Sequence, residues 1–391
     1  MRVGIVCEFN PLHLGHQHLL TQVRALGATA IVCAMSGNFV QRGEAALLNK
    51  HTRASAAVAC GADLVLELPT PWAMATAEIF ARGGVALLKM AGCDHMAFGS
   101  ECGDSGLLAS VAAAVDSAEV QEKLRENLET GITFAAARAQ AVAAVLGETA
   151  AQVLARPNDT LAVEYLRASR ALGANLTPIA IPRVGAGHDE VAQEGIASAS
   201  FVRQLVHEGK VEEACAYLPE EMALALREAV EKGEIADVSR CERAVMAFLR
   251  SCQPDSLAPY DGGGEGLYRR VYEAARQGRS VEEVLSLAKT KRYTAARLRR
   301  MVMAAWLELV RETETPPYAR VLAANEVGRR VLREMRDKSA PALTKAADVA
   351  ALGTAAEELL CSESKWTDLY GLCCESVPPC GEEYRKTPKM K

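Results

Sequence analysis

Residues 1–20 read MRVGIVCEFNPLHLGHQHLL and combine an apolar run, a turn and two closely spaced histidines. The run from Val3 to Cys7 predicts a buried β-strand that ends at the Asn10-Pro11 turn. His13 and His16 follow where a helical pattern begins. The free N–H groups of a helix start attract phosphate, and side chains three residues apart share one helix face. Because the pattern directly follows a buried strand, we interpret it as a phosphate site rather than an ordinary helix start.

Further apolar runs alternate with helical patterns through the first half of the chain. Buried strands are predicted at residues 29–34, 63–69, 93–98 and 175–184, with helices between them. Such alternation is typical of a parallel sheet with helices on both faces. We therefore expect an α/β fold: a Rossmann-like, doubly wound parallel sheet followed by an α-helical C-terminal domain. Ligands of such sheets bind at the carboxyl ends of the strands.

Length and composition indicate two domains. At 391 residues the chain exceeds one ordinary core, and 50% hydrophobic with 24% charged residues is a globular composition. From about residue 212 the pattern is one of amphipathic helices, so we expect an α/β domain over residues 1–210 and a helical domain over residues 211–391. No run of about 18 apolar residues predicts a membrane span. We expect a cytoplasmic protein with no membrane partner.

Polar segments follow several of the predicted strands. Residues 35–44 (MSGNFVQRGE) carry side chains that favour a binding loop over a plain connection, namely Ser36, Asn38, Gln41 and Arg42. Gly99 either lets a nucleotide approach a strand end closely or is a simple turn glycine. Asn158 and Asp159 are candidates for capping the helix that follows them.

A second candidate phosphate site follows the fifth predicted strand, which ends near Arg183. Ser198 or Ser200 starts a helix, and Arg203 falls within its first turns. Hydroxyls and a guanidinium at a helix N-terminus suit β- and γ-phosphates. A serine cap followed by a surface arginine is the alternative, and the histidine pair upstream favours the phosphate site.

Charge and cysteines give weaker signals. The net charge of −5 is not that of a general nucleic-acid binder. Residues 289–300 are an exception, with six cations, no acid and Tyr293, so they form either an RNA-binding patch or a solvated helix face. The twelve cysteines include no C-x-x-C pair, and the spacing of the four near the C-terminus predicts no metal site: Cys361, Cys373, Cys374 and Cys380.

Six segments, in order, carry a specific resemblance: GIVCEFNPLHLGHQ (4–17), MSGNFVQRGE (35–44), DLVLELP (63–69), FGSE (98–101), PNDTLAVEY (157–165) and IASASFVR (196–203). Together they resemble the bacterial tRNA(Met) cytidine acetate ligase family, within the H-x-G-H nucleotidyltransferase-like superfamily. The resemblance implies an ATP-dependent ligase that converts acetate to acetyl-adenylate and releases pyrophosphate. It then implies transfer of the acetyl group to N4 of the wobble cytidine of elongator tRNA(Met).

The resemblance also implies roles for individual residues. His13 and His16 are expected to be catalytic, and Mg²⁺ is expected to accompany ATP. The resemblance also makes residues 1–210 the expected ATP-binding catalytic domain and residues 211–391 the expected tRNA-binding domain. The RNA-binding residues are expected from the charge run itself, with Tyr293 expected to stack on a base: Lys289, Lys291, Arg292, Tyr293, Arg297, Arg299 and Arg300. The ATP-binding residues implied are Val6, Cys7, Glu8, Phe9, Asn10, Pro11, Leu12, His13, Leu14, Gly15, His16, Gln17, His18, Leu19, Gly99, Asn158, Arg183, Ser198, Ser200 and Arg203.

Three departures from the family pattern affect only the detail of the pocket. Leu14 stands where the family usually has asparagine, and Ser200 stands for a threonine. The loop 185–189 lacks a tyrosine often found before His188. The acetate pocket, the oligomeric state and the role of the cysteine-bearing tail stay open, and no obligatory protein partner is indicated.

Two other functions compete with the ligase. An adenylyltransferase that moves AMP to a small phosphorylated metabolite has the same histidine motif and needs no basic helix. A non-catalytic, ATP-sensing RNA-binding protein binds ATP without turning it over.

Overall fold

The computed structural model describes residues 1–183, 196–262, 266–290, 293–310 and 314–390, and within them the chain folds around one mixed sheet. The strand order is β10-β8-β5-β2-β1-β6-β7, with β9 beside β8. Neighbours from β5 through β2, β1 and β6 to β7 are all parallel. The bounds are β1 Arg2–Cys7, β2 Ala30–Ser36, β5 Leu64–Leu68, β6 His95–Ser100, β7 Thr177–Pro182, β8 Ala319–Ala324, β9 Ala342–Leu343 and β10 Lys389–Met390. The predicted doubly wound parallel sheet is confirmed.

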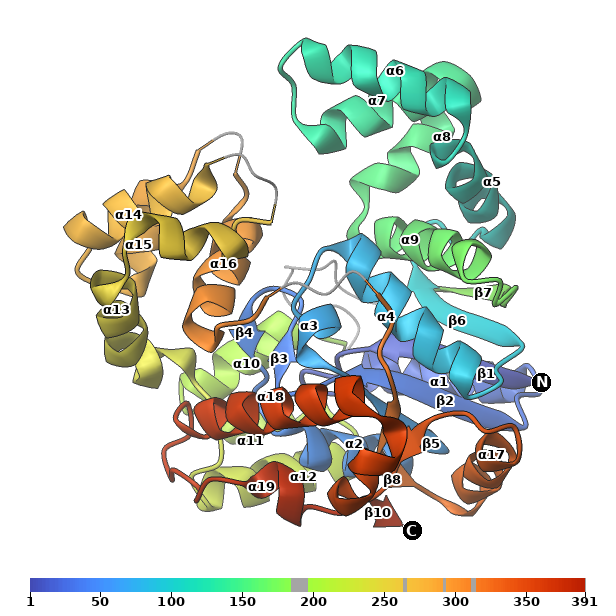
Figure 1. Cartoon of the computed structure of the whole chain (residues 1–391). Coiled ribbons are helices and arrows are strands. Elements are labelled where there is room, and N and C mark those ends of the chain that lie inside the picture. Colours follow the sequence, from blue (N-terminus) through green and yellow to red (C-terminus); the bar gives the residue numbers. More distant parts are fainter. Residues whose placement is uncertain (184–195, 263–265, 291–292, 311–313, 391) are drawn as a thin grey trace.

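Helices cover both faces of this sheet (Figure 1). Alternate residues of β1 enter different cores, because successive side chains of a strand point to opposite faces: Val3 and Ile5 pack in one, Val6 in the other. The helices that flank the sheet are α1 (Leu14–Ala25), α2 (Lys50–Ala59), α3 (Thr70–Ala73), α4 (Ala77–Met90), α9 (Pro157–Ala171), α10 (Ala199–His207), α11 (Val211–Cys215), α12 (Glu220–Glu231) and α17 (Glu326–Asp337).

Glycines bring α4 unusually close to β1. A Cβ on Gly4 would lie 2.5 Å from a methyl carbon of Leu88, and one on Gly84 would lie 2.6 Å from a methyl carbon of Val6. Since real Cβ atoms do not approach other atoms this closely, larger residues here would push the helix away from the strand. The close packing sets the position of α4 beside the end of β1.

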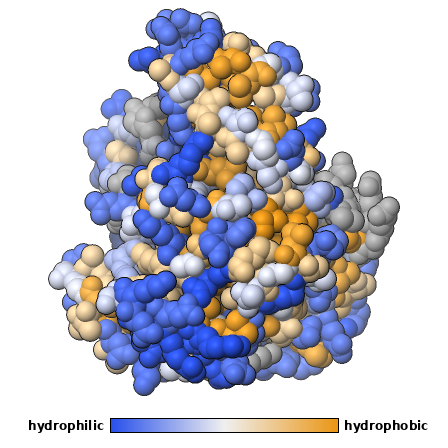
Figure 2. All heavy atoms as spheres, turned by 90° about the vertical axis from the view of Figure 1, so that its right-hand side faces the viewer, coloured by the Kyte–Doolittle hydropathy of each residue, from blue (hydrophilic) through white to orange (hydrophobic). Residues whose placement is uncertain are grey.

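Two helical lobes stand above the sheet in Figure 1. One contains α5 (Ser105–Val115), α6 (Ala118–Glu129), α7 (Phe134–Leu146) and α8 (Glu148–Gln152). The other contains α13 (Glu242–Ser251), α14 (Leu267–Gln277), α15 (Val281–Ala288) and α16 (Ala295–Leu307). Figure 2 shows hydrophilic side chains gathered at the base of the molecule, with apolar ones more frequent at mid-height and toward the top. Exposed apolar residues of the first lobe include Leu128, Phe134 and Leu146.

After the second lobe the chain returns to the sheet. β8 pairs antiparallel with β5, and β10 adds to the far side of β8. The C-terminal helices are α18 (Thr354–Gly371) and α19 (Glu382–Arg385), and short 3₁₀ helices occupy Val153–Ala155, Val238–Cys241, Pro254–Tyr260 and Ala346–Leu352. The helical C-terminal region is present, but residues 211–391 also supply strands to the sheet. The boundary at residue 210 therefore stays a prediction about separate units.

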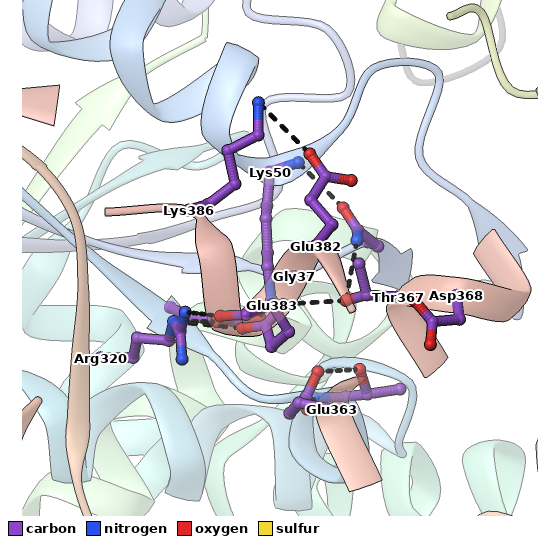
Figure 3. A network of polar contacts seen from close by, with 12 residues as sticks. Gly37, Lys50, Arg320, Glu363, Thr367, Asp368, Glu382, Glu383 and Lys386 are labelled. Atoms are coloured by element: carbon purple, nitrogen blue, oxygen red, sulfur yellow. Dashed lines mark hydrogen bonds and ion pairs between the residues drawn. The ribbon is translucent and has the colours of Figure 1, made fainter. Parts of the chain in front are cut away.

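The chain beyond α18 is built into the core. Glu383 of α19 is fully buried and forms ion pairs with Lys50 at 2.7 Å and with Arg320 at 3.1 Å. Lys50 also pairs with Glu67 of β5 at 2.6 Å. Figure 3 shows side chains from α2, β8, α18 and α19 converging on this cluster. The sequence offered no function for the tail, and the structure shows that it neutralises buried cations contributed by distant segments.

A neighbouring arginine, Arg53 of α2, holds the backbone where β1 and β2 end. Its fully buried guanidinium donates hydrogen bonds to the carbonyl oxygens of Leu48, Glu8, Ser36 and Gly37. Buried backbone carbonyls need such donors when no strand neighbour supplies them. The hydrogen bonds of Arg53 thus fix the positions of the ends of β1 and β2.

We expect Lys50→Met to lower the free energy of unfolding by about 3–5 kcal/mol, because it leaves the two buried carboxylates of Glu67 and Glu383 with Arg320 as their one remaining ion-pair partner among the described residues. Urea denaturation followed by circular dichroism measures the change. The control is Lys386→Met, whose side chain is 53% exposed in its ion pair with Glu382, and which should cost less than about 1 kcal/mol. Equal losses for the two variants would contradict the role given to the cluster.

Candidate active site

A cavity of about 240 Å³ opens at the carboxyl ends of β1, β6 and β7. Its walls come from β1 and the following turn, the start of α1, the loop after β2, the start of α9 and the start of α10. This is the edge of the sheet where parallel α/β proteins bind ligands. The cavity therefore lies where the sequence predicts a nucleotide.

The two histidines form the N-terminal cap of α1. His13 Nδ1 accepts a hydrogen bond from the Gly15 N–H at 3.1 Å, and the His13 N–H donates to His16 Nδ1 at 3.3 Å. The rings stack with their centroids 3.8 Å apart. A Cβ on Gly15 would lie 2.9 Å from His13 Cε1, so glycine leaves room for the ring. The reciprocal cap presents both rings to the cavity.

This cap also fixes the proton on each imidazole. Since both Nδ1 atoms accept hydrogen bonds, the neutral rings carry their proton on Nε2. Burial, followed by the charge of Arg183, lowers the pKa of His13 to about 3. Burial, His13 and Arg183 lower the pKa of His16 as well. At neutral pH the pair therefore consists of two uncharged N–H donors, which an anion entering the cavity would meet.

The second predicted phosphate motif lies opposite. Ser198 caps α10 by accepting the Phe201 N–H at 3.2 Å, so the capping interpretation holds for it while it also lines the cavity. Arg203 donates to the carbonyl of Asn10 at 2.9 Å and to the Ser200 hydroxyl at 3.3 Å. The guanidinium thus joins the turn after β1 to the start of α10. These contacts bring the two sequence motifs into one site.

The third wall is held by the carboxylates of Glu101, which no sequence pattern indicated, and Asp159. The prediction that Asn158 or Asp159 caps α9 is wrong, because the N-cap position of this helix is Arg156. Glu101 accepts hydrogen bonds from the Asn158 side chain at 2.6 Å and the Asp159 N–H at 2.8 Å. Asp159 in turn accepts from the Ser100 hydroxyl at 2.5 Å and the Glu101 N–H at 2.9 Å. This clasp places Asn158 beside Gly99. The one sequence feature that could have indicated this interaction is the position of Glu101 directly after Gly99 and Ser100 at the end of a predicted strand.

The predicted binding loop divides into two parts. Gln41 and Arg42 line the cavity. Ser36 and Asn38 are buried instead, and the Asn38 side chain accepts the Lys50 N–H at 2.9 Å and donates to Thr367 at 3.3 Å. Gln41 and Arg42 lie in the turn of a hairpin formed by β3 (Phe39–Val40) and β4 (Glu44–Ala45). Hydrogen-bonding capacity alone did not distinguish structural from cavity-facing residues.

The cavity also has an apolar end that the sequence did not reveal. Its side chains come from elements far apart in the chain and share no spacing pattern: Phe80, Phe98, Leu161, Tyr165, Ile181 and Ile196. Such walls favour flat or apolar groups.

The cavity gathers most of the residues predicted to bind ATP. Those that line it are Val6, Cys7, Glu8, Phe9, Asn10, His13, Gly15, His16, His18, Leu19, Gly99, Asn158, Arg183, Ser198, Ser200 and Arg203. Pro11, Leu12, Leu14 and Gln17 do not line it, and Leu12 is fully buried in the core. The role of each residue toward ATP stays a prediction. His188 and the loop 185–189 lie outside the described residues.

Several residues of the predicted RNA-binding segment make contacts within the protein. Arg299 pairs with Glu44, and Arg300 donates to the Gln41 carbonyl at 3.3 Å, so α16 is tied to the loop that lines the cavity. Only 6% of Tyr293 is exposed, so little of its surface is available to an RNA base, and its role toward RNA stays a prediction. Its tertiary burial was not visible from the spacing. Arg297 lies against Tyr293 and Asp261, Lys289 is exposed, and Lys291 and Arg292 lie outside the described residues.

The described residues contain neither a metal-binding cluster nor a membrane-spanning helix. No cluster of three or more His, Cys, Asp or Glu side chains with metal-binding geometry occurs among them. None of their helices has the length and apolarity needed to cross a membrane.

Comparison with known proteins gives consistent relatives. A family profile described as HIGH Nucleotidyl Transferase matches residues 1–383. The tRNA(Met) cytidine acetate ligase of Caldanaerobacter subterraneus subsp. tengcongensis is 36% identical over 360 residues, covering 88% of each chain. That of Acetivibrio thermocellus is 32% identical and covers 95% of this chain and 94% of its own.

Two solved structures superpose on this chain over its full length. The crystal structure of apo Thermotoga maritima TmcAL superposes with a TM-score of 0.94 at 32% identity, covering 100% of this chain and 99% of that one. The structure of the same protein bound with alpha-thio ATP superposes with a TM-score of 0.92 at 31% identity and the same coverage.

The lowered histidine pKa values predict a pH dependence of stability. His13 stays neutral in the folded chain down to about pH 3 but takes up a proton in the unfolded chain below about pH 6.5, so its contribution is present above that pH and lost as pH falls. Between pH 6 and pH 4 it should lower the unfolding free energy by about 1.4 kcal/mol per pH unit.

The substitution His13→Asn keeps a capping acceptor and should reduce the total slope by about 1.4 kcal/mol per pH unit in urea denaturation measured at a series of pH values, while His16, whose pKa is also lowered, keeps its own contribution. Ser117→Asn, at the cap of α6, introduces no titrating group and should keep the wild-type slope. An unchanged slope in His13→Asn would contradict the assigned neutral state.

Proposed function

This chain belongs to the HIGH nucleotidyl transferase family and, within it, to the tRNA(Met) cytidine acetate ligases, and from that membership we propose that it joins acetate to tRNA at the expense of ATP. The proposed acceptor is N4 of the wobble cytidine in elongator tRNA(Met). The reaction forms acetyl-adenylate, with release of pyrophosphate, and then transfers the acetyl group. Its tRNA substrate places it in the cytoplasm.

One observation carries the proposal: the capped histidine pair and the Ser200–Arg203 motif line a single cavity. In the first step an acetate oxygen attacks the α-phosphorus, and the bond to pyrophosphate breaks. The Nε2–H groups of His13 and His16 then stabilise negative charge on the phosphates. Arg203 and the hydroxyls of Ser198 and Ser200 receive the β- and γ-phosphates. Donors held in place before reaction stabilise developing charge without reorganisation.

Mg²⁺ belongs to this proposal as a companion of ATP. The hydroxyl oxygens of Ser198 and Ser200 are hard donors of the kind that Mg²⁺ accepts, with phosphate oxygens and water as its remaining ligands. When bound it supplies positive charge to the triphosphate.

The α13–α16 lobe is proposed to hold tRNA beside the cavity. The contacts of Arg299 with Glu44 and of Arg300 with Gln41 connect this lobe to the cavity wall. Lys289, Lys291 and Arg292 are proposed to neutralise the phosphate backbone. The adenylyltransferase alternative gives no reason for a basic helix fixed to the cavity wall.

The deciding assay combines purified protein, ATP, Mg²⁺, labelled acetate and bacterial tRNA, and then digests the RNA to nucleosides. We expect label in N4-acetylcytidine, dependent on ATP. His16→Ala should lower acetate-dependent ATP–pyrophosphate exchange by about 100-fold or more, since one fewer donor meets the phosphates. AMP transfer to a small acceptor, without labelled RNA, would favour the adenylyltransferase. Binding of ATP without turnover would favour the sensor.

The basic segment is tested separately with the triple change Lys289→Ala, Lys291→Ala and Arg292→Ala. We expect it to raise KM for tRNA and to reduce the salt dependence of tRNA binding, because each lost phosphate contact lowers the slope of log K against log salt by about 0.7–0.9. Filter binding at several salt concentrations measures the slope. An unchanged slope would contradict contact between this segment and the tRNA backbone.

A further inference from the structure

Two carboxylates line the cavity among the described residues, Glu8 and Glu44. Glu8 directly follows the last residue of β1 and lies five residues before His13. Glu44 begins β4, on the loop that follows β2. Both are close enough to the phosphate motifs to share one cavity with them, but their surroundings differ.

Glu44 is neutralised by cations on two sides. It pairs with Arg299 of α16, and Arg203 of α10 lies 3.7 Å away. Its contacts hold these two elements against the cavity wall. Each of its two oxygens therefore faces a guanidinium group, so neither oxygen is left open to a ligand.

Glu8 has one oxygen free for a ligand. Its Oε1 accepts the Gln41 N–H at 2.8 Å, while Oε2 makes no hydrogen bond or ion pair with any described residue. The residue is half-buried, and its carbonyl is held by Arg53 at 2.6 Å. The side chain is therefore oriented by its neighbours and open on one side.

Burial raises the pKa of Glu8, although the Gln41 N–H and the charges of Arg203 and Arg53 oppose it. A carboxylate with a raised pKa accepts a proton more readily than one in water. This agrees with the geometry, which leaves Oε2 available.

The histidines cannot accept the proton in this arrangement. Both Nδ1 atoms are occupied by the helix cap, and both Nε2 atoms carry hydrogen. They donate to phosphate oxygens, whereas the second step of the proposed function needs an acceptor. The amine of the acceptor base must lose a proton when it becomes an amide.

We propose that the Glu8 carboxylate receives the proton which the exocyclic amine of cytidine loses as it attacks the activated acetyl carbon, a role that rests on the proposed function. The nitrogen lone pair forms the new C–N bond, and the bond between the acetyl carbon and the phosphate oxygen of AMP breaks. AMP leaves with that electron pair. The amine proton passes to Glu8 Oε2 and then to water.

The same carboxylate distinguishes acceptor bases. Cytosine offers N4–H₂ as a donor, whereas uracil presents an oxygen acceptor at the corresponding position. The uracil oxygen would face a Glu8 oxygen with no hydrogen between them, so both acceptors would lack a hydrogen-bond donor. Glu8 thus selects an amine-bearing base as well as deprotonating it.

Glu8→Gln separates the two half-reactions. Acetate-dependent ATP–pyrophosphate exchange reports adenylate formation, and single-turnover transfer from preformed acetyl-adenylate to tRNA(Met) transcript reports the second step. We expect the ratio of transfer rate to exchange rate to fall by about 100-fold or more, the usual contribution of a general base. The wild-type transfer rate should rise with pH through a pKa above 4.5, and the variant should lose that rise.

Glu44→Gln is the matched control, since it changes the other carboxylate of the same cavity. It should alter exchange and transfer together through Arg203 and leave their ratio and the pH profile unchanged. Glu8→Asp, which keeps the carboxylate, should restore the pH-dependent rise.

The outcomes separate the two proposals. Wild-type protein without acetate-dependent exchange or transfer would overturn the ligase function, and the role of Glu8 with it. Wild-type activity combined with an unchanged ratio in Glu8→Gln would overturn the role of Glu8 alone. A fall in exchange as large as the fall in transfer would assign Glu8 to ATP binding and would also overturn it.

Discussion

The site depends on one buried guanidinium. Arg53 donates to backbone carbonyls at the ends of β1 and β2 and thereby fixes the backbone from which Glu8 and the loop at residues 36–37 project. Strand ends normally splay toward solvent, where water satisfies their carbonyls. Here the guanidinium of Arg53 binds these carbonyls in place of water, and this fixes the backbone beside the cavity. Lys50, one turn earlier on α2, extends the charged layer toward Glu67 and Glu383.

The buried ion pairs of Lys50, Glu67, Arg320 and Glu383 connect the cavity near the N-terminus to segments from the end of the chain. The cations are Lys50 of α2 and Arg320 of β8, and the anions are Glu67 of β5 and Glu383 of α19. Figure 3 shows Lys50, Arg320 and Glu383 in this arrangement. Breaking a buried ion pair leaves an uncompensated charge, so each segment requires the others. The final helix is consequently part of the nucleotide-binding half rather than an appendage. The second lobe is joined to that half by the contacts of Arg299 and Arg300 with the cavity loop.

Within the cavity, hydrogen bonding gives similar residue types different chemistry. The cap at α1 uses both Nδ1 atoms and makes the histidines donors. Arg203 and Arg299 neutralise Glu44, whereas Glu8 keeps one oxygen unpaired. Two imidazole donors and a carboxylate oxygen without a partner among the described residues thus line the same cavity. A reaction that forms an adenylate and then an amide requires both.

The sequence by itself determined the parallel sheet, the helix start at His13 and the second motif at Ser198–Arg203, because these depend on short-range periodicity and on residue types adjacent in the chain. It also determined the family, through six motifs in order. The pairing of β8 with β5, the burial of Glu383 and Tyr293, and the clasp between Glu101 and Asp159 were decided only by tertiary structure. Each joins residues separated by tens to hundreds of positions, and no local pattern records which charge a distant segment neutralises.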